Sequence, residues 1–251
     1  SSTITFNHQR ECMSQSDLDA LERRLRLARE GHSRHPSRWF QTLRHWWLSH
    51  ADATAKRMLD LTASGLALLL LSPFAVLLAI AIRLEDRGPV LYWQKRVGLR
   101  GHVFDFPKFR SMRTDSDEIR KKLEQLNEHG SAAVTFKMEN DPRITRIGRF
   151  IRKTSIDELP QLWSIFAGHM SLVGPRPALP QEVAQYTLSD RRRLECIPGL
   201  TCIWQISGRS QIPFHQQVEL DVLYIETRTV LLDIELIVKT VPAVLFARGA
   251  S

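Results

Sequence analysis

The sequence predicts a mainly helical α+β protein with one membrane-embedded segment and a small β-hairpin. Three observations lead to this fold class. Residues 61–82 contain no charged side chain, several other stretches repeat apolar residues at helical spacing, and residues 88–113 have the pattern of two short strands joined by a turn. The chain has 251 residues, enough for one sizeable domain or two small ones.

The composition indicates an anionic partner. Lys and Arg total 35 against 27 Asp and Glu, which gives a formal charge of +8. Such an excess is typical of proteins that meet nucleic acid, lipid headgroups or phosphorylated substrates. The three cysteines, Cys12, Cys196 and Cys202, form neither an even disulfide set nor a metal-binding pattern. We therefore expect reduced thiols in a cytosol-facing protein.

The first fifty residues predict two amphipathic helices. Residues 16–30 begin with a Ser16-x-x-Asp19 capping pattern and place leucines on one face. Residues 37–50 contain three of the six tryptophans, at helical spacing and beside basic residues. Because rings with polar tips suit the headgroup layer, we expect this second helix to lie at a membrane interface. Packing on the domain is the alternative.

Residues 61–82 are long enough to cross a bilayer. A straight helix of this length measures about 33 Å, close to the roughly 30 Å of a hydrocarbon core. However, Pro73 has no amide hydrogen and must kink or break the helix, while the Ser72 hydroxyl can bond the freed backbone. Basic residues flank both ends, and positive charge holds a flank on the cytoplasmic side. The residues alone leave open a kinked span and a hairpin within one leaflet.

The next region predicts a basic β-hairpin over residues 88–113. It carries six Lys or Arg residues and a single acid, Asp105. Beside a membrane, such a hairpin could bind lipid phosphate or a nucleotide diphosphate, or simply face water. Its basic residues, Arg110 among them, are the candidates for such a phosphate contact.

Asp157 and Glu158 are the candidate catalytic residues. They follow a basic helical stretch over residues 144–153 and precede an apolar run that ends at Phe166. In the simpler interpretation, Ser155 and Glu158 form a capping box at a helix start. In the other, two carboxylates that face arginines hold a divalent cation and attack phosphorus.

The remaining chain adds two arginines in turn-rich settings. Arg176 lies in the rigid tetrapeptide Gly-Pro-Arg-Pro over 174–177, which suits a guanidinium fixed on phosphate. Residues 198–210 predict a short strand around Trp204 and place Arg209 after a glycine.

Helical patterns complete the chain. They cover 116–129, 214–226 and 230–246. The last pattern is strongly apolar but too interrupted by charge to span a membrane, and it offers a surface for a homo-oligomer. The sequence has no P-loop, GxGxxG, HExxH or GxSxG motif.

Taken together, these motifs resemble those of the bacterial sugar transferases, the polyprenyl-phosphate hexose-1-phosphate transferases. The resemblance covers about residues 55–247 in the family's order. It is carried by KRMLDL, LLSPF, GPVLYWQKRVG, FPKFRSMR, DPRITRIGRFIRKTSIDELPQLWSI, GHMSLVGPRP and PGLTCIWQISGR. Cys202 departs from the glycine usual in the family, and Ile197 stands where arginine is common.

The resemblance implies a monotopic protein on the cytoplasmic face of the bacterial inner membrane. Its membrane anchor would be a re-entrant helix–break–helix hairpin that turns at Ser72-Pro73. On this basis residues 1–50 are an N-terminal extension, residues 51–87 the membrane hairpin and residues 88–251 a cytosolic catalytic domain. Nucleic acid is not an expected partner, since the basic residues accompany a membrane segment and an acidic pair.

The resemblance also implies a Mg²⁺-dependent phosphoglycosyl transferase. It would move a sugar-1-phosphate from a UDP-sugar to polyprenyl phosphate, release UMP, and so initiate exopolysaccharide or other glycan synthesis. Asp157 would be the nucleophile and Glu158 the Mg²⁺ ligand. Matching positions imply phosphate or substrate contacts for Lys108, Arg152, Arg176 and Asp221. The sequence does not indicate which sugar is transferred.

Overall fold

One long helix, α2 (Arg38–Glu85), dominates the fold. The computed structural model describes residues 19–24, 26–27, 38–116, 119, 141–207 and 212–245, with backbone alone for 38–51 and 243–245. The other helices are α4 (Arg146–Lys153), α5 (Gln161–Phe166), α6 (Pro180–Val183), α7 (Ile203–Ser207), α8 (Phe214–Thr227) and α9 (Val230–Leu245). The strands are β1 (Leu91–Val97), β2 (Val103–Phe109), β3 (Ser171–Val173) and β4 (Gly199–Thr201), and the 3-10 helices are η1 (Leu99–Gly101), η2 (Ile156–Glu158) and η3 (Asp190–Glu195).

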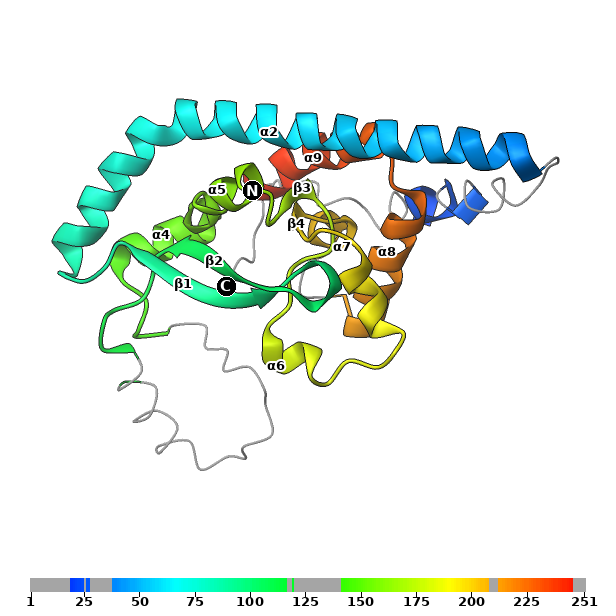
Figure 1. The fold of residues 1–251 in the computed structure, drawn as a ribbon. Helices are drawn as coiled ribbons and strands as arrows, with labels where there is room; N and C mark the ends of the chain where they lie inside the picture. Colours follow the sequence, from blue (N-terminus) through cyan, green and yellow to red (C-terminus); the bar gives the residue numbers. More distant parts are fainter. Residues whose placement is uncertain are drawn as a thin grey trace, which may run out of the picture.

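The expected break at Ser72-Pro73 is a bend within a continuous helix. All 48 residues of α2 are helical, Pro73 included, and Figure 1 shows the cyan, C-terminal part of α2 turning toward α4. The Ser72 hydroxyl donates to the Leu69 carbonyl at 2.8 Å. That carbonyl is the one an amide at position 73 would otherwise bond, so the serine compensates for the proline. The re-entrant path through lipid stays a prediction.

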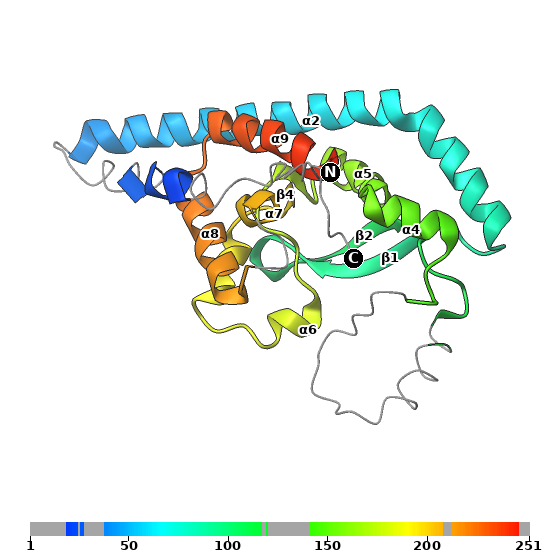
Figure 2. The same ribbon diagram turned by 180° about the vertical axis from the view of Figure 1, so that it is seen from behind.

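The domain is attached to α2 on both sides of the apolar stretch. Near its start, Lys56 forms an ion pair with Asp233 of α9 at 2.6 Å. At its end, the Glu85 carboxylate accepts hydrogen bonds from the amides of Arg146 and Ile147, the first residues of α4, at 2.7 and 3.1 Å. Figures 1 and 2 show α5 and α9 beside α2, with the β1–β2 hairpin on the opposite side of the body.

Between these attachments α2 exposes large apolar side chains. They are Leu66, Leu69, Leu70, Leu71, Phe74, Val76, Leu77, Ile80 and Leu84. Within the described residues, one helical stretch, Asp52–Glu85, is long and apolar enough to cross a membrane. The neighbouring helices add exposed Phe150, Trp163, Phe166, Leu231 and Val238. This surface is far more apolar than water-facing helices normally are.

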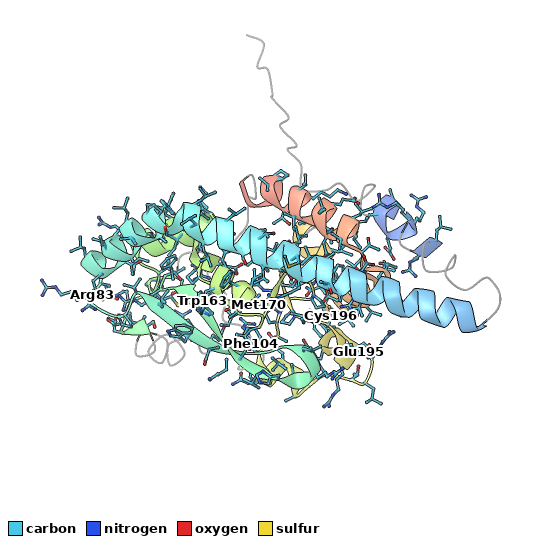
Figure 3. All side chains as sticks on the ribbon, turned by 45° about the horizontal axis from the view of Figure 1, so that its top comes forward. Arg83, Phe104, Trp163, Met170, Glu195 and Cys196 are labelled. Atoms are coloured by element: carbon cyan, nitrogen blue, oxygen red, sulfur yellow. The ribbon has the colours of Figure 1, made fainter. Side chains whose placement is uncertain are left out.

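Three buried clusters hold the body together. One joins α7, α8 and α9 and includes Leu21 of the helical segment 19–24. The second packs Phe104 and Met170, both labelled in Figure 3, against the apolar part of α2. The third joins the C-terminal part of α2 to β2 and α4 through Ile82, Phe109 and Ile151, the last of which is fully buried.

Two small sheets position the loops of the site. The predicted hairpin is confirmed: β1 pairs with β2 in antiparallel register, with Gln94 opposite Phe106. β3 pairs with β4 in parallel, Val173 opposite Thr201. The strand expected around Trp204 was placed wrongly. The strand instead occupies 199–201, where Gly199 lets the backbone approach Gly174 closely, and Trp204 lies in α7.

Most other predictions agree with the described residues. Helices predicted over 144–153, 214–226 and 230–246 correspond to α4, α8 and α9. Residues 38–50 belong to α2 instead of forming a separate helix, so α2 crosses the boundary expected at residue 50. Cys196 and Cys202 are buried free thiols. Cys12 and nearly all of the helix predicted over 116–129 lie outside the described residues.

Candidate active site

Asp157 and Glu158 lie on the short turn η2 between α4 and α5. Ser155, just before the turn, has a φ of +56°, a left-handed conformation that costs a serine about 1–2 kcal/mol. Its side chain makes no capping hydrogen bond, so the capping-box interpretation is wrong. The strained residue instead redirects the chain, and both carboxylates line a pocket.

Glu158 is held by two cations. Its Oε1 accepts hydrogen bonds from Lys108 Nζ at 3.0 Å and from Arg176 Nη2 at 2.9 Å. Burial alone would raise the pKa of Glu158, but Arg176 and Lys108 outweigh it and hold the pKa at about 2. Glu158 is therefore ionised at any physiological pH.

Asp157 is paired less closely with cations than Glu158 is. Its nearest cation, Lys108 Nζ, lies 4.0 Å from Oδ2. Burial raises the pKa of Asp157, Lys108 opposes that change, and the adjacent Glu158 charge adds to it. A carboxylate that is desolvated and not engaged by a close ion pair keeps its oxygen lone pairs available, as a nucleophile requires.

Arg176 is fixed by the backbone of its own loop. Gly174 N donates to the Thr201 carbonyl at 3.0 Å, and Gly199 N donates to the Pro175 carbonyl at 2.9 Å. A β-carbon on Gly174 would lie 2.5 Å from the Ile197 carbonyl, so only glycine permits this approach. The guanidinium is thereby directed at Glu158.

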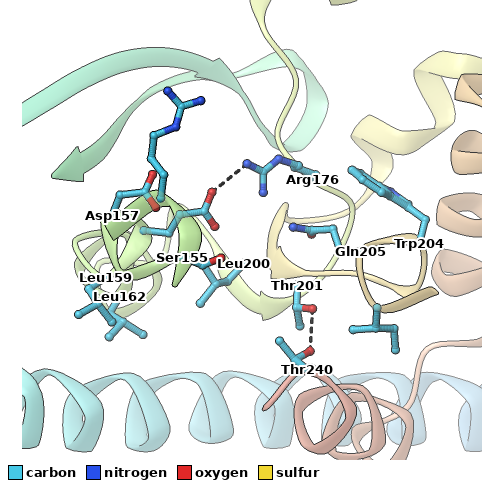
Figure 4. Close-up of a pocket in the computed structure, with 13 residues that line it drawn as sticks. Ser155, Asp157, Leu159, Leu162, Arg176, Leu200, Thr201, Trp204, Gln205 and Thr240 are labelled. Carbon is cyan, nitrogen blue, oxygen red and sulfur yellow. Dashed lines mark hydrogen bonds and ion pairs between the residues drawn. The ribbon is translucent and has the colours of Figure 1, made fainter. Parts of the chain in front are cut away.

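A cavity of about 420 Å³ extends from the acidic pair to α7. Its lining residues are Arg152, Ser155, Asp157, Glu158, Leu159, Leu162, Arg176, Leu200, Thr201, Trp204, Gln205, Ile206 and Thr240. Figure 4 shows Arg176 between Asp157 on one side and Trp204 on the other. The volume suits a small-molecule ligand.

The structure gathers some of the predicted site residues and separates others. Lys108, Arg152 and Arg176 surround the acidic pair. Arg110 is buried and pairs with Asp86 just beyond α2, and it does not line the pocket. Arg209 lies outside the described residues.

Asp221 is also placed away from the pocket. It is 1% exposed and forms an ion pair with the buried Arg193 at 2.7 Å. Burial raises the pKa of Asp221 to about 6, against the pull of Arg193. These contacts indicate a core ion pair.

The residues that line the pocket on the side away from the acidic pair were not among the predicted site residues. Trp204 and Gln205 belong to the segment PGLTCIWQISGR, so that motif contained the signal. Thr240 comes from α9, and its hydroxyl lies 2.8 Å from that of Thr201. Nothing in the sequence around Thr240 distinguishes it from any other polar residue of a helix.

The two carboxylates are compatible with Mg²⁺. Within the described residues, no group of three or more His, Cys, Asp or Glu could hold a metal by itself. Mg²⁺, however, commonly binds one or two carboxylates and completes its shell with water and substrate phosphates. Glu158, ionised and aimed into the pocket beside Asp157, fits that donor set.

Comparison with known proteins gives a consistent result. The chain matches the family described as "Bacterial sugar transferase" over residues 51–247. It is 47% identical over 202 residues to the galactosyl transferase CpsE of Streptococcus agalactiae, covering 80% of this chain and 44% of that protein. It is 39% identical over 198 residues to the exopolysaccharide production protein ExoY of Rhizobium meliloti, covering 78% and 88%.

A third relative is the undecaprenyl-phosphate galactose phosphotransferase of Salmonella typhimurium. It is 41% identical over 197 residues, which cover 78% of this chain and 41% of that protein. The chain therefore spans less than half of the streptococcal and Salmonella relatives, and most of the rhizobial one.

Proposed function

Because this chain belongs to the bacterial sugar transferase family, we propose that it transfers a sugar-1-phosphate from a UDP-sugar to polyprenyl phosphate. The observation that carries the proposal is the arrangement of Asp157 and Glu158 among Lys108, Arg152 and Arg176, in a pocket beside an apolar helix. Relatives named for undecaprenyl-phosphate sugar transfer and exopolysaccharide production support the same reaction.

In the first step, an Asp157 carboxylate oxygen attacks the phosphorus that carries the sugar. The bond from this phosphorus to the bridging oxygen breaks, and UMP leaves with that oxygen and the electron pair. The product is an acyl phosphate on Asp157 that carries the sugar. Desolvation of Asp157, which raises its pKa, makes the ionised carboxylate a stronger nucleophile.

Charge on the transferring phosphate is balanced by the surrounding cations. Arg176 can form two parallel hydrogen bonds to phosphate oxygens, and Lys108 contributes a mobile point charge. Bound Mg²⁺ supplies further positive charge to phosphate oxygens, and Glu158 is the residue that would hold it. Once phosphate competes for Lys108 and Arg176, the Glu158 carboxylate becomes available for that role.

In the second step, an oxygen of polyprenyl phosphate attacks the same phosphorus. The bond to Asp157 breaks, the free carboxylate returns, and a polyprenyl diphosphate sugar forms. This order predicts ping-pong kinetics, with UMP released before the acceptor is added.

We propose a monotopic placement for α2. The domain is bonded to α2 at Lys56 and again at Glu85, and α5 packs along the helix between them. A crossing helix would therefore carry the charged pocket into hydrocarbon, at a cost of several kcal/mol per unpaired charge. A helix that enters and leaves one leaflet keeps the acidic pair at headgroup height, where a lipid phosphate lies.

Cysteine labelling tests this placement. Asp52→Cys and Arg87→Cys, at exposed positions on either side of the apolar stretch, should both react with a membrane-impermeant maleimide from the same side of the membrane. Leu70→Cys, at a position that is 74% exposed on α2, serves as the lipid-buried control and should react no more than the unsubstituted chain, whose native cysteines set the background. Labelling of the two flanks from opposite sides would refute the monotopic placement.

A UMP-release assay tests the reaction. The full chain in detergent or nanodiscs is incubated with Mg²⁺ and a panel of UDP-sugars, first without and then with polyprenyl phosphate. We expect a single-turnover burst of UMP without acceptor and continuous release with it. Asp157→Asn should abolish both, while Glu219→Gln, at an exposed position of α8, should change neither. Full turnover by Asp157→Asn would refute the mechanism.

A further inference from the structure

Arg96 stands behind the phosphate site and has no role in the reaction described above. It lies on β1, on the hairpin face that also carries Gln94 and, on β2, Phe106 and Lys108. Its guanidinium lies over the Phe106 ring, 5.3 Å from the centroid, and Lys108 Nζ lies 5.5 Å from the same centroid. One buried aromatic ring thus supports both cations.

The Arg96 guanidinium donates its hydrogen bonds to uncharged acceptors. Nε and Nη2 donate to Gln94 Oε1 at 3.1 and 2.7 Å, and Nη1 donates to the Pro177 carbonyl at 3.0 Å. By contrast, the neighbouring Lys95 points to the other face and pairs with Asp105 at 2.8 Å. Among the residues that the structure describes, no carboxylate forms an ion pair with the half-buried Arg96, although Glu182 and Glu158 attract its charge from a greater distance.

The Pro177 carbonyl connects Arg96 to Arg176. Pro177 follows Arg176 directly, and Val97 N donates to the next carbonyl, that of Ala178, at 2.9 Å. β1 therefore holds the C-terminal side of the arginine loop through one side-chain bond and one backbone bond. The other side of the loop is held by β4. Loss of the Arg96 side chain would remove the first of the two bonds from β1.

The charges of Arg96 and Arg176 also interact directly. Burial and the repulsion from Arg176 lower the pKa of Arg96 to about 10, so it stays charged at neutral pH. With Lys108, Arg152 and Arg176, it gives the site two more positive charges than the acidic pair has negative ones. The diphosphate of a nucleotide sugar carries about two negative charges, so this excess of positive charge attracts it.

We propose that Arg96 is a positioning residue of the phosphate site, which holds the Arg176 loop through the Pro177 carbonyl. The inference rests on the phosphate-binding role proposed above for Arg176. In this proposal Arg96 acts through Arg176. Coupling between the two residues therefore distinguishes this role from one in which Arg96 only stabilises the fold.

A double-mutant cycle on the full chain tests the coupling. Binding of inorganic pyrophosphate is measured by calorimetry for the wild type, Arg96→Gln, Arg176→Gln and the double variant, with Lys95→Gln as the matched control on the same strand. We expect Arg96→Gln to weaken binding about tenfold in the wild type and less than about threefold in the Arg176→Gln background, because residues that share a role are not additive. Arg96→Lys should recover part of the loss, and Lys95→Gln should change binding less than about twofold.

Three results would overturn the inference: no pyrophosphate binding by the wild type, equal effects of Arg96→Gln in both backgrounds, or an effect no larger than that of Lys95→Gln. Because the readout is anion binding, it is independent of turnover. A wild type that binds pyrophosphate with the expected coupling but releases no UMP would refute the proposed reaction and leave the role of Arg96 supported.

Discussion

Replacing Glu158 by glutamine removes one charge from the centre of the site and little else. The carboxamide oxygen of the substituted side chain can still accept hydrogen bonds from Lys108 and Arg176, which bond Glu158 Oε1 at 3.0 and 2.9 Å. What is lost is the electrostatic stabilisation of the ionised carboxylate, which in the wild type lowers the pKa of Glu158 from 4.5 to about 2. That difference corresponds to about 3 kcal/mol of folding free energy at neutral pH.

The pH dependence of this loss has a definite sign. A carboxyl group with a depressed folded-state pKa stabilises the protein above its unfolded pKa, here 4.5, and the stabilisation disappears as the pH falls toward 2. The wild type should therefore exceed Glu158→Gln by about 3 kcal/mol at about pH 7 and by less than about half of that at about pH 3. For a chain of this size, about 3 kcal/mol corresponds to a melting temperature lower by roughly 6–12 °C.

The assay is thermal unfolding of both proteins in the same detergent, followed by near-ultraviolet circular dichroism at neutral pH and again at about pH 3. Glu219→Gln, at an exposed position of α8, controls for the loss of a carboxylate in general. Two results would refute this prediction: Glu158→Gln melts at the same temperature as Glu219→Gln, or the stability difference between Glu158→Gln and the wild type is the same at both pH values.

The same variant separates ion pairing from metal binding. If Glu158 holds Mg²⁺ during turnover, Glu158→Gln should lower UMP release and require more Mg²⁺ for its half-maximal rate. An unchanged Mg²⁺ requirement would contradict the metal role without affecting the stability prediction.

Three further changes have clear expected outcomes. Lys108→Met should move the acidic limb of the UMP-burst pH profile to higher pH, because Asp157 reacts ionised and Lys108 lowers its pKa; an unmoved limb would contradict this electrostatic link. Asp221→Asn should cost roughly 3–5 kcal/mol in denaturant unfolding, because it leaves Arg193 buried without its carboxylate; a raised donor KM at full stability would instead favour the substrate contact implied by the family. Ser155→Gly should stabilise the fold by about 1 kcal/mol in the same assay, since glycine adopts a φ of +56° without strain, and lower stability would show that the serine side chain is needed.

The sequence identified those parts of the fold and of the candidate site that depend on a local pattern of residues. The charge-free run over 61–82, the strand–turn–strand pattern of the hairpin and the helical patterns of α4, α8 and α9 all depend on residues close together in the chain. Pro73 and Ser72 were also recognisable, because a missing amide and a nearby hydroxyl act within one helical turn. The motifs around Asp157 and Arg176 were sufficient to indicate the family.

The choice between two uses of Glu158 required the tertiary structure. A capping box and an ion-paired carboxylate that lines a pocket have the same local sequence, Ser-x-x-Glu. What decides is the arrival of Lys108 from β2 and Arg176 from the loop after β3, which lie 50 and 18 residues away in the chain. No local pattern encodes such distances.

Long-range ion pairs also determine the different roles of the arginines, which the sequence alone does not distinguish. Arg110 and Arg176 each follow a strand, yet one pairs with Asp86 beyond α2 while the other reaches Glu158. A guanidinium takes its role from whichever carboxylate the fold brings within about 3 Å, since Coulomb energy falls with distance and burial magnifies it. The sequence by itself determined the long apolar segment and the acidic pair. Only the folded chain determined which cations surround that pair.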